Sequence, residues 1–301
     1  MKVVAIFGPT AVGKTGVAIE LAGALRARGE DPVAVSCDAL QVYRGLEALT
    51  GAPDAAERER LEHRLVGIAE VTEEFSAGRF AELAREEIDG LLAEARRPIV
   101  VGGTGLYLRA VLSELELRPP VPAAVRESVE AEVAARGPEA LHDELEPALA
   151  ATVHPRDRKR IARALELQRA GLDPPPAGGG ELWTARLRHP TLLAGIVCDR
   201  AELDARIDAR VDTLVAAGAA EEARRADAAG ASRTARVALG FDELLRGDVE
   251  AMKREHRRYA RRQLTWMRRM PGVRLIERTG RTGDEVAREI VGLLDENGGR
   301  Q

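Results

Sequence analysis

One segment near the start of the chain constrains its fold more than any other: residues 8–15 read Gly-Pro-Thr-Ala-Val-Gly-Lys-Thr. They match the pattern G-x-x-x-x-G-K-[ST], in which glycines let backbone N–H groups turn inward around phosphate oxygens. A β-branched run over 2–7 precedes the segment and a helical periodicity over 16–28 follows it, as such a loop requires. Lys14 offers a point charge to the distal phosphate, and the Thr15 hydroxyl suits Mg²⁺. The segment therefore predicts a site for a di- or triphosphate, with Mg²⁺ as cofactor.

Short buried runs recur along the chain and alternate with helical stretches. After the first run, strands are expected at 33–36, 98–101, 192–198 and 273–276. Helices are expected at 16–28, 201–227, 252–269 and 284–294, with others in the acidic stretch 54–96. Strands that alternate with helices at this spacing predict an α/β fold, namely a P-loop-type parallel sheet wound with helices.

The middle of the chain lacks this alternation. Residues 114–190 have a helical pattern, interrupted by Pro119-Pro120 and by a stretch rich in proline and glycine at 173–180. Proline and glycine at this density indicate a loop or linker. The sequence therefore predicts a smaller helical insertion domain at 114–190, within a P-loop catalytic core formed by 1–113 and 191–301.

Composition excludes several classes of protein. The 45 basic and 49 acidic residues give a formal net charge of −4, which excludes a strongly basic nucleic-acid binder and leaves only local basic surfaces. No apolar stretch approaches the ~20 residues that span a bilayer, and the first residues lack the pattern of a secretory signal. Two cysteines, Cys37 and Cys198, cannot make a disulfide framework or a four-cysteine zinc site. We expect a cytoplasmic monomer without membrane association.

The phosphate-binding segment does not settle which reaction takes place. A nucleotide hydrolase usually has a second strand that ends in an aspartate holding Mg²⁺. Here the most buried strand, 99–101, runs into Gly102-Gly103-Thr104-Gly105 instead. That argues against a hydrolase, although Asp38, after the strand at 33–36, could take the same role.

Four blocks of sequence together resemble the tRNA dimethylallyltransferase (tRNA isopentenyltransferase) family of the bacterial type. They are residues 8–15, 36–43 (Ser-Cys-Asp-Ala-Leu-Gln-Val-Tyr), 102–107 (Gly-Gly-Thr-Gly-Leu-Tyr) and 259–266 (Tyr-Ala-Arg-Arg-Gln-Leu-Thr-Trp). A fifth, 160–166, is similar to a helix of the family's RNA-binding insertion. The chain departs from the family pattern at 49–53 and 62–65, so contacts within residues 45–65 are not carried over.

The resemblance implies transfer of a dimethylallyl group from its diphosphate to the exocyclic amine of the adenosine 3′ of the anticodon. In this reading Asp38 accepts a proton from the amine, Thr10 bonds the bridging oxygen, and Arg210 stabilises the leaving diphosphate. The resemblance places the diphosphate on Gly8, Pro9, Thr10, Ala11, Val12, Gly13, Lys14, Thr15 and Arg206. On position alone, Asp38 could instead be a helix cap or a Mg²⁺ ligand. Likewise, Arg210 could be a solvated partner of neighbouring aspartates.

The resemblance also implies contacts to tRNA, whose target base must be flipped out of its stack to reach a buried diphosphate. Asp38, Ala39, Leu40, Gln41 and Thr104 are the positions expected to contact the base and its neighbours, although Thr104 could equally cap a helix. On the insertion, phosphate contacts are expected from Arg126, Arg158, Lys159, Arg160 and Arg163. A second basic stretch covers 253–269, and both stretches could instead be solvated helix faces.

Three other functions share parts of this pattern. A P-loop kinase of a nucleotide or small metabolite shares the loop and the sheet. A prenyltransferase of free adenine nucleotides shares the donor site, although the basic insertion favours RNA. A nucleotide-switched RNA-binding module would bind both ligands without making a covalent product.

Overall fold

The computed structural model describes residues 1–115, 120–172 and 185–296. The chain divides into two compact units, one made of residues 1–115 and 185–301 and the other of residues 116–184. These boundaries lie within a few residues of the expected limits of the insertion. The loop predicted at 173–180 lies outside the described residues.

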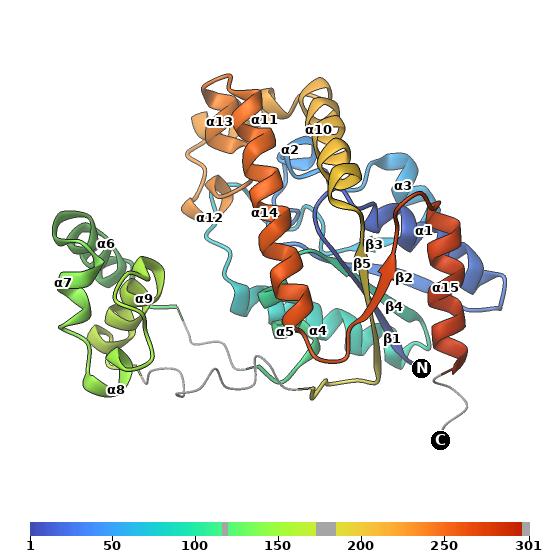
Figure 1. Cartoon of the computed structure of the whole chain (residues 1–301), viewed down its shortest axis with the longest axis horizontal. Helices are drawn as coiled ribbons and strands as arrows, with labels where there is room; N and C mark the ends of the chain where they lie inside the picture. Colours follow the sequence, from blue (N-terminus) through green and yellow to red (C-terminus); the bar gives the residue numbers. More distant parts are fainter. Residues whose placement is uncertain (116–119, 173–184, 297–301) are drawn as a thin grey trace. The chain divides into compact units, whose positions relative to one another are not determined.

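The larger unit is built on six parallel strands in the spatial order β3-β2-β4-β1-β5-β6 (Figure 1). The strands are β1 (Val3–Phe7), β2 (Pro32–Cys37), β3 (His63–Arg64), β4 (Arg97–Gly102), β5 (Thr191–Val197) and β6 (Arg274–Glu277). The predicted α/β fold is confirmed. Strand β3 was not predicted, because two residues are too few to leave a pattern in the sequence. The carboxyl ends of β1, β2 and β4 meet at one edge, where α/β folds bind their ligands.

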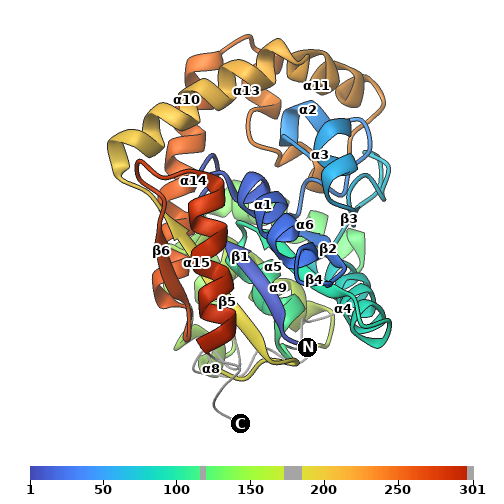
Figure 2. The same ribbon diagram turned by 90° about the vertical axis from the view of Figure 1, so that its right-hand side faces the viewer.

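Alternation along β1 determines what each face of the sheet buries. Val4 and Ile6 pack with α1 (Lys14–Arg26) and α15 (Gly283–Glu296), which lie side by side in Figure 2. Val3, Ala5 and Phe7 face the opposite way, toward α4 (Ala77–Ala93) and α5 (Gly105–Leu112). Both sets are buried because a parallel sheet is covered by helices on its two faces.

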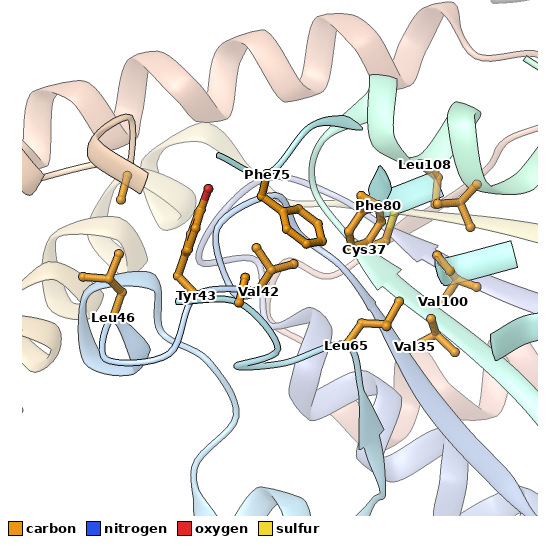
Figure 3. Packing of buried hydrophobic residues seen from close by; sticks show 14 of the residues in the cluster. Val35, Cys37, Val42, Tyr43, Leu46, Leu65, Phe75, Phe80, Val100 and Leu108 are labelled. Atoms are coloured by element: carbon orange, nitrogen blue, oxygen red, sulfur yellow. The ribbon is translucent and has the colours of Figure 1, made fainter. Parts of the chain in front are cut away.

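On the second face the core reaches beyond the sheet into the connecting segments. Figure 3 shows Phe75, Phe80 and Val42 packed together with Leu108. The rings of Phe75 and Phe80 meet edge to face, with centroids 6.5 Å apart, a favourable arrangement for aromatic pairs. This packing fixes the loop after β2, from which Asp38 comes.

The remaining helices of the larger unit are short apart from two. They are α2 (Glu47–Thr50), α3 (Ala55–Arg60), α10 (Arg200–Ala216), α11 (Ala219–Ala228), α12 (Arg233–Arg236), α13 (Phe241–Leu245) and α14 (Val249–Arg269). The single helix predicted at 201–227 was wrong: it breaks at Gly218, whose φ of 95° is left-handed and ends the helix. The helix predicted from 252 begins three residues earlier, because Asp248 caps it through the Ala251 N–H.

The smaller unit is helical and has its own core. It contains α6 (Ala123–Arg136), α7 (Pro138–His142), α8 (Pro147–Ala150) and α9 (Arg158–Arg169). Ile161 and Leu165 of α9 are buried with Val129 and Val133 of α6. Among the described residues of both units, no helix is long and apolar enough to cross a bilayer.

Candidate active site

A cavity of about 320 Å³ opens at the carboxyl edge of the sheet. It is lined by the loop before α1, the ends of β2 and β4, the segment 49–57, and side chains from α10 and α14. Nine of the predicted site residues line it: Thr10, Ala11, Gly13, Lys14, Thr15, Asp38, Leu40, Gln41 and Arg210. Predicted residues of the larger unit that are not in its lining are Gly8, Pro9, Val12, Ala39, Thr104 and Arg206.

The loop after β1 is held in a tight curve. Gly13 has a φ of 93° and precedes the first turn of α1, while Val12 is buried in the core. A Cβ on Gly8 would come within 2.8 Å of the Ile196 carbonyl oxygen of β5, so only glycine allows this approach. The curve directs backbone N–H groups and the positive end of α1 toward the cavity, as anion binding requires.

Lys14 is bound to the loop itself. Its Nζ donates to the carbonyl oxygens of Gly8, at 3.1 Å, and Pro9, at 2.9 Å. Burial, followed by the nearby charge of Arg210, lowers the pKa of Lys14 to about 8, and Asp38 partly opposes this. A lysine with a lowered pKa that makes no ion pair within the described residues is a candidate group for binding an anion.

Asp38 follows the last residue of β2 and lines the same cavity. Its Oδ1 accepts the Leu40 N–H at 3.0 Å, which closes a local turn, and no helix begins there. The structure therefore does not bear out the reading of Asp38 as a helix cap. Nearby, Gln41 accepts from Ser36 Oγ at 2.9 Å and donates to the Gly51 carbonyl at 3.2 Å. These bonds connect the end of β2 to the segment that faces Arg210.

Arg210 points into the cavity because its neighbouring aspartates are bound elsewhere. Asp208 pairs with Arg257 of α14, and Asp212 lies 2.7 Å from Lys253 of the same helix. Figure 1 shows α10 and α14 side by side. Asp204 lies nearest Arg200, at 3.9 Å. The alternative of a surface ion pair for Arg210 is thus not what the structure shows.

Carbonyl oxygens, not carboxylates, hold the Arg210 guanidinium. Nη2 donates to Gly51 O at 3.3 Å, with Thr50 O at 3.5 Å. Burial lowers the pKa of Arg210, opposed by the charges of Asp38 and Glu57. The segment 50–51 is fixed in turn by Glu222 of α11, whose carboxylate accepts the N–H groups of Ala48 and Leu49 at 3.0 and 2.8 Å. A buried carboxylate at the start of α2 thus positions the carbonyls that hold Arg210.

Arg206 does not join Arg210, although the two lie one helical turn apart. Its guanidinium pairs with Glu202 of its own helix at 2.7 Å. Glu202 also accepts the Gly280 N–H at 3.1 Å. Arg206 therefore holds the carboxylate that binds the loop after β6. To reach a ligand in the cavity, Arg206 would have to leave Glu202.

Helix α14 supplies three cavity residues that were not predicted, two of them within the block 259–266 and His256 just before it. His256, Tyr259 and Gln263 line the cavity. The Tyr259 hydroxyl and Thr104 Oγ1 are 2.9 Å apart, and the Thr104 side chain makes no cap bond to the start of α5. Burial lowers the pKa of His256, which favours the neutral imidazole, and its Nδ1 lies 2.9 Å from the Met252 carbonyl oxygen. Spacing of three and four residues was the signal that these side chains share one face.

A sequence model of the IPP transferase family matches residues 41–270. The chain belongs to the IPP transferase family. It is 42% identical to a tRNA dimethylallyltransferase of Anaeromyxobacter dehalogenans, over 91% of this chain and 94% of that protein. It is 37% identical to one of Acetivibrio thermocellus, over 94% of both. Among solved structures it is similar to the full-length tRNA isopentenylpyrophosphate transferase of Bacillus halodurans, with a TM-score of 0.71, 33% identity, and coverage of 98% and 96%. The family resemblance seen in the sequence is confirmed.

The basic residues of this IPP transferase fall into two groups. In the smaller unit, Arg158 and Lys159 are exposed at the start of α9 and make no ion pair within the described residues. Arg160 lies 3.3 Å from Asp157, and Arg163 lies 3.0 Å from the buried Glu166. Arg126 is half-buried on α6.

On α14 the predicted basic stretch divides between two roles. Lys253 and Arg257 turn to the aspartates of α10. The others are exposed on the outer side of the helix: Arg254, Arg258, Arg261, Arg262, Arg268 and Arg269. The Arg262 guanidinium lies over the Tyr259 ring, 5.4 Å from its centroid.

Replacing Gly51 by alanine tests whether Arg210 binds phosphate. A Cβ at Gly51 would overlap the Arg210 guanidinium, so the arginine would leave its position. We expect Gly51→Ala to weaken binding of inorganic diphosphate about tenfold, the worth of a lost charge-assisted hydrogen bond. Isothermal calorimetry measures this directly. Gly45→Ala is the matched control: Gly45 has a similar left-handed φ of 84°, but a Cβ there has no neighbour within 4 Å. Equal affinities for the two variants would contradict the assignment.

The low pKa of Lys14 predicts a pH-dependent contribution to anion binding. Because its pKa lies near 8, Lys14 is mostly charged at pH 7 and loses its charge as the pH rises through 8. Lys14→Ala should therefore weaken diphosphate binding strongly at pH 7 and much less at pH 9.5, with the gap closing by up to about tenfold per pH unit. The ratio of the two dissociation constants cancels the titration of diphosphate itself. A ratio that stays constant from pH 7 to 9.5 would refute this.

Proposed function

We propose that this chain transfers a dimethylallyl group from dimethylallyl diphosphate to the exocyclic amine of the adenosine 3′ of the anticodon in tRNA, releasing diphosphate. One observation carries the proposal: a single cavity holds Lys14 and Arg210, neither of them paired with a carboxylate of the described residues, and, beside them, the carboxylate of Asp38. Cations for a leaving anion and a base for an attacking amine are what this reaction needs. The curated relatives carry the name of this activity.

The phosphate-binding loop and two cations serve the donor. As the carbon–oxygen bond breaks, the diphosphate takes the electron pair and its negative charge grows. The loop N–H groups, Lys14 and Arg210 stabilise that charge, which is the largest single contribution in many enzymes. Thr10, half-buried in the cavity lining, donates its hydroxyl to the bridging oxygen. Arg206 joins only if it leaves Glu202.

Asp38 serves the acceptor. The amine of adenine is a poor nucleophile because its lone pair is delocalised into the ring. As the new nitrogen–carbon bond forms, one amine proton passes to the Asp38 carboxylate, so the product nitrogen stays neutral. A positioned base of this kind contributes about 10²–10⁴-fold in rate.

Thr15 lies in the first turn of α1, directly after Lys14, and is half-buried in the cavity lining. Among the residues that the structure describes, no group of three or more His, Cys, Asp or Glu forms a cage for a metal. A Mg²⁺ ion here would use the Thr15 hydroxyl, phosphate oxygens of the donor and water, which suits its preference for substrate phosphates. When bound, the ion would neutralise part of the diphosphate charge.

The smaller unit and residues around the cavity provide the contacts to the RNA. Exposed positive side chains on α9 suit the phosphates of the anticodon stem-loop, with Arg126, Arg160 and Arg163 as further contacts. Asp38, Ala39, Leu40 and Gln41, together with Thr104, contact the flipped base and its neighbours. A base must leave its stack before its amine can reach a donor held in such a cavity.

The first test combines the purified protein with dimethylallyl diphosphate, Mg²⁺ and unmodified tRNA, followed by digestion and mass spectrometry of the nucleosides. We expect dimethylallyl adenosine from the wild type. Asp38→Ala should bind diphosphate as the wild type does but transfer at least 100-fold more slowly, because the amine loses its base. No product, while a positive-control enzyme modifies the same RNA, would favour the kinase alternative. Normal turnover by Asp38→Ala would exclude Asp38 as the base.

A salt titration tests the smaller unit. Replacing Arg158, Lys159 and Arg160 together by alanine should weaken tRNA binding and reduce the slope of log affinity against log salt by about 2. The reason is that binding releases fewer counterions from the RNA when fewer phosphates are contacted. The control changes three exposed arginines of the larger unit, Arg224, Arg225 and Arg246, and alters net charge equally. Equal salt slopes for the two triple variants would show that the smaller unit does not contact the RNA.

A further inference from the structure

Gln263 is a buried amide that connects the two halves of the site. It lies on α14 with only 5% of its surface exposed. Its Oε1 accepts the N–H of Thr10 at 2.8 Å, and its Nε2 donates to the carbonyl of Gly103 at 2.9 Å. Thr10 belongs to the donor loop, and Gly103 precedes Thr104 in the turn after β4. One side chain therefore holds both segments.

The turn after β4 is shaped around this helix. A Cβ on Gly103 would overlap the Gln263 amide, and a Cβ on Gly105 would come within 2.6 Å of the Trp266 ring. Between them, Thr104 meets the Tyr259 hydroxyl. Three side chains of one face of α14, spaced by four and three residues, thus fit three successive residues of the turn. A side chain at position 103 would therefore displace the Gln263 amide.

The two partners require an amide. Thr10 presents an N–H group and Gly103 presents a carbonyl oxygen, so the side chain between them must accept one hydrogen bond and donate another. Glutamine does both with a single planar group, which also fixes the orientation of its oxygen and nitrogen. Methionine, of similar size, does neither, and an ionised glutamate would face the Gly103 carbonyl with a second acceptor.

We infer that Gln263 is a positioning residue for the transfer step: it fixes the donor loop at Thr10 against the turn that carries Thr104. This inference rests on the proposed function. Gln263 acts through Thr10 and Gly103, and diphosphate binding depends on other groups, namely Lys14, Arg210 and the remaining loop amides. Its loss therefore changes the distance between donor and acceptor more than the affinity for the donor, and small misplacements of reacting groups are costly in rate.

The first variant is Gln263→Met. We expect kcat for tRNA prenylation to fall at least tenfold, while KM for dimethylallyl diphosphate stays within about threefold, since the lost interaction affects orientation more than ground-state binding. Thr265→Ala, on the exposed face of the same helix, is the control and should keep wild-type constants. Unchanged kcat in Gln263→Met, or a large rise in donor KM at unchanged kcat, would overturn the inference.

The second variant, Gln263→Glu, separates positioning from simple support of the fold. A protonated glutamic acid can accept from Thr10 and donate to Gly103, whereas the carboxylate cannot donate. At saturating donor, its kcat as a fraction of the wild-type value should rise as the pH falls from 8.5 to 6. A fraction that does not change with pH overturns the inference, even if Gln263→Met fails to fold. Failure of the proposed function gives a different result, because the wild type itself then makes no prenylated product.

Discussion

Two cations in the cavity are held by carbonyl oxygens, and the chemistry of the site depends on this. Lys14 bonds to Gly8 and Pro9, and Arg210 bonds to Gly51. Carbonyl groups fix the direction of a cation without neutralising its charge, so both stay available to an anion. Because burial disfavours the charged form of Lys14, and the nearby charge of Arg210 adds to this, the pKa of Lys14 falls to about 8. An anion in the proposed diphosphate site would offset both effects, because it favours the charged form of Lys14.

Helix α14 binds the two aspartates that flank Arg210 on α10. The helix draws Asp208 and Asp212 outward through Arg257 and Lys253, while its Gln263 and Tyr259 turn inward to the loops of the sheet. Both pairs are partly buried on the side of the cation. Their effect is on direction: with both aspartates bound, the nearest acceptors for Arg210 are the carbonyls of segment 50–51. One helix thus determines both the charge and the geometry of the cavity.

Much of the fold could be predicted from the sequence, because burial leaves a pattern in every strand of useful length. The loop at 8–15 and the position of Asp38 after β2 followed from local sequence and from the family resemblance. Long-range partners could not be predicted. Nothing near Gly280 signals that Glu202 will accept its N–H, and nothing near Ala48 signals that Glu222 will cap α2 from another helix. Residues 49–53, where the chain departs from the family pattern, line the cavity, and only the folded chain shows that.

The place of the smaller unit in the chain has a consequence for synthesis on the ribosome. β1 pairs with β5, Val3 opposite Thr191, and the whole of the smaller unit lies between them. Strand β1 therefore cannot pair with β5 until the ribosome has synthesised the insertion. The insertion has its own core in α6 and α9 and short-range contacts, which form quickly. It can fold while β1 is still the edge strand of an incomplete sheet. The unit proposed to bind RNA therefore forms before the cavity of the larger unit is complete.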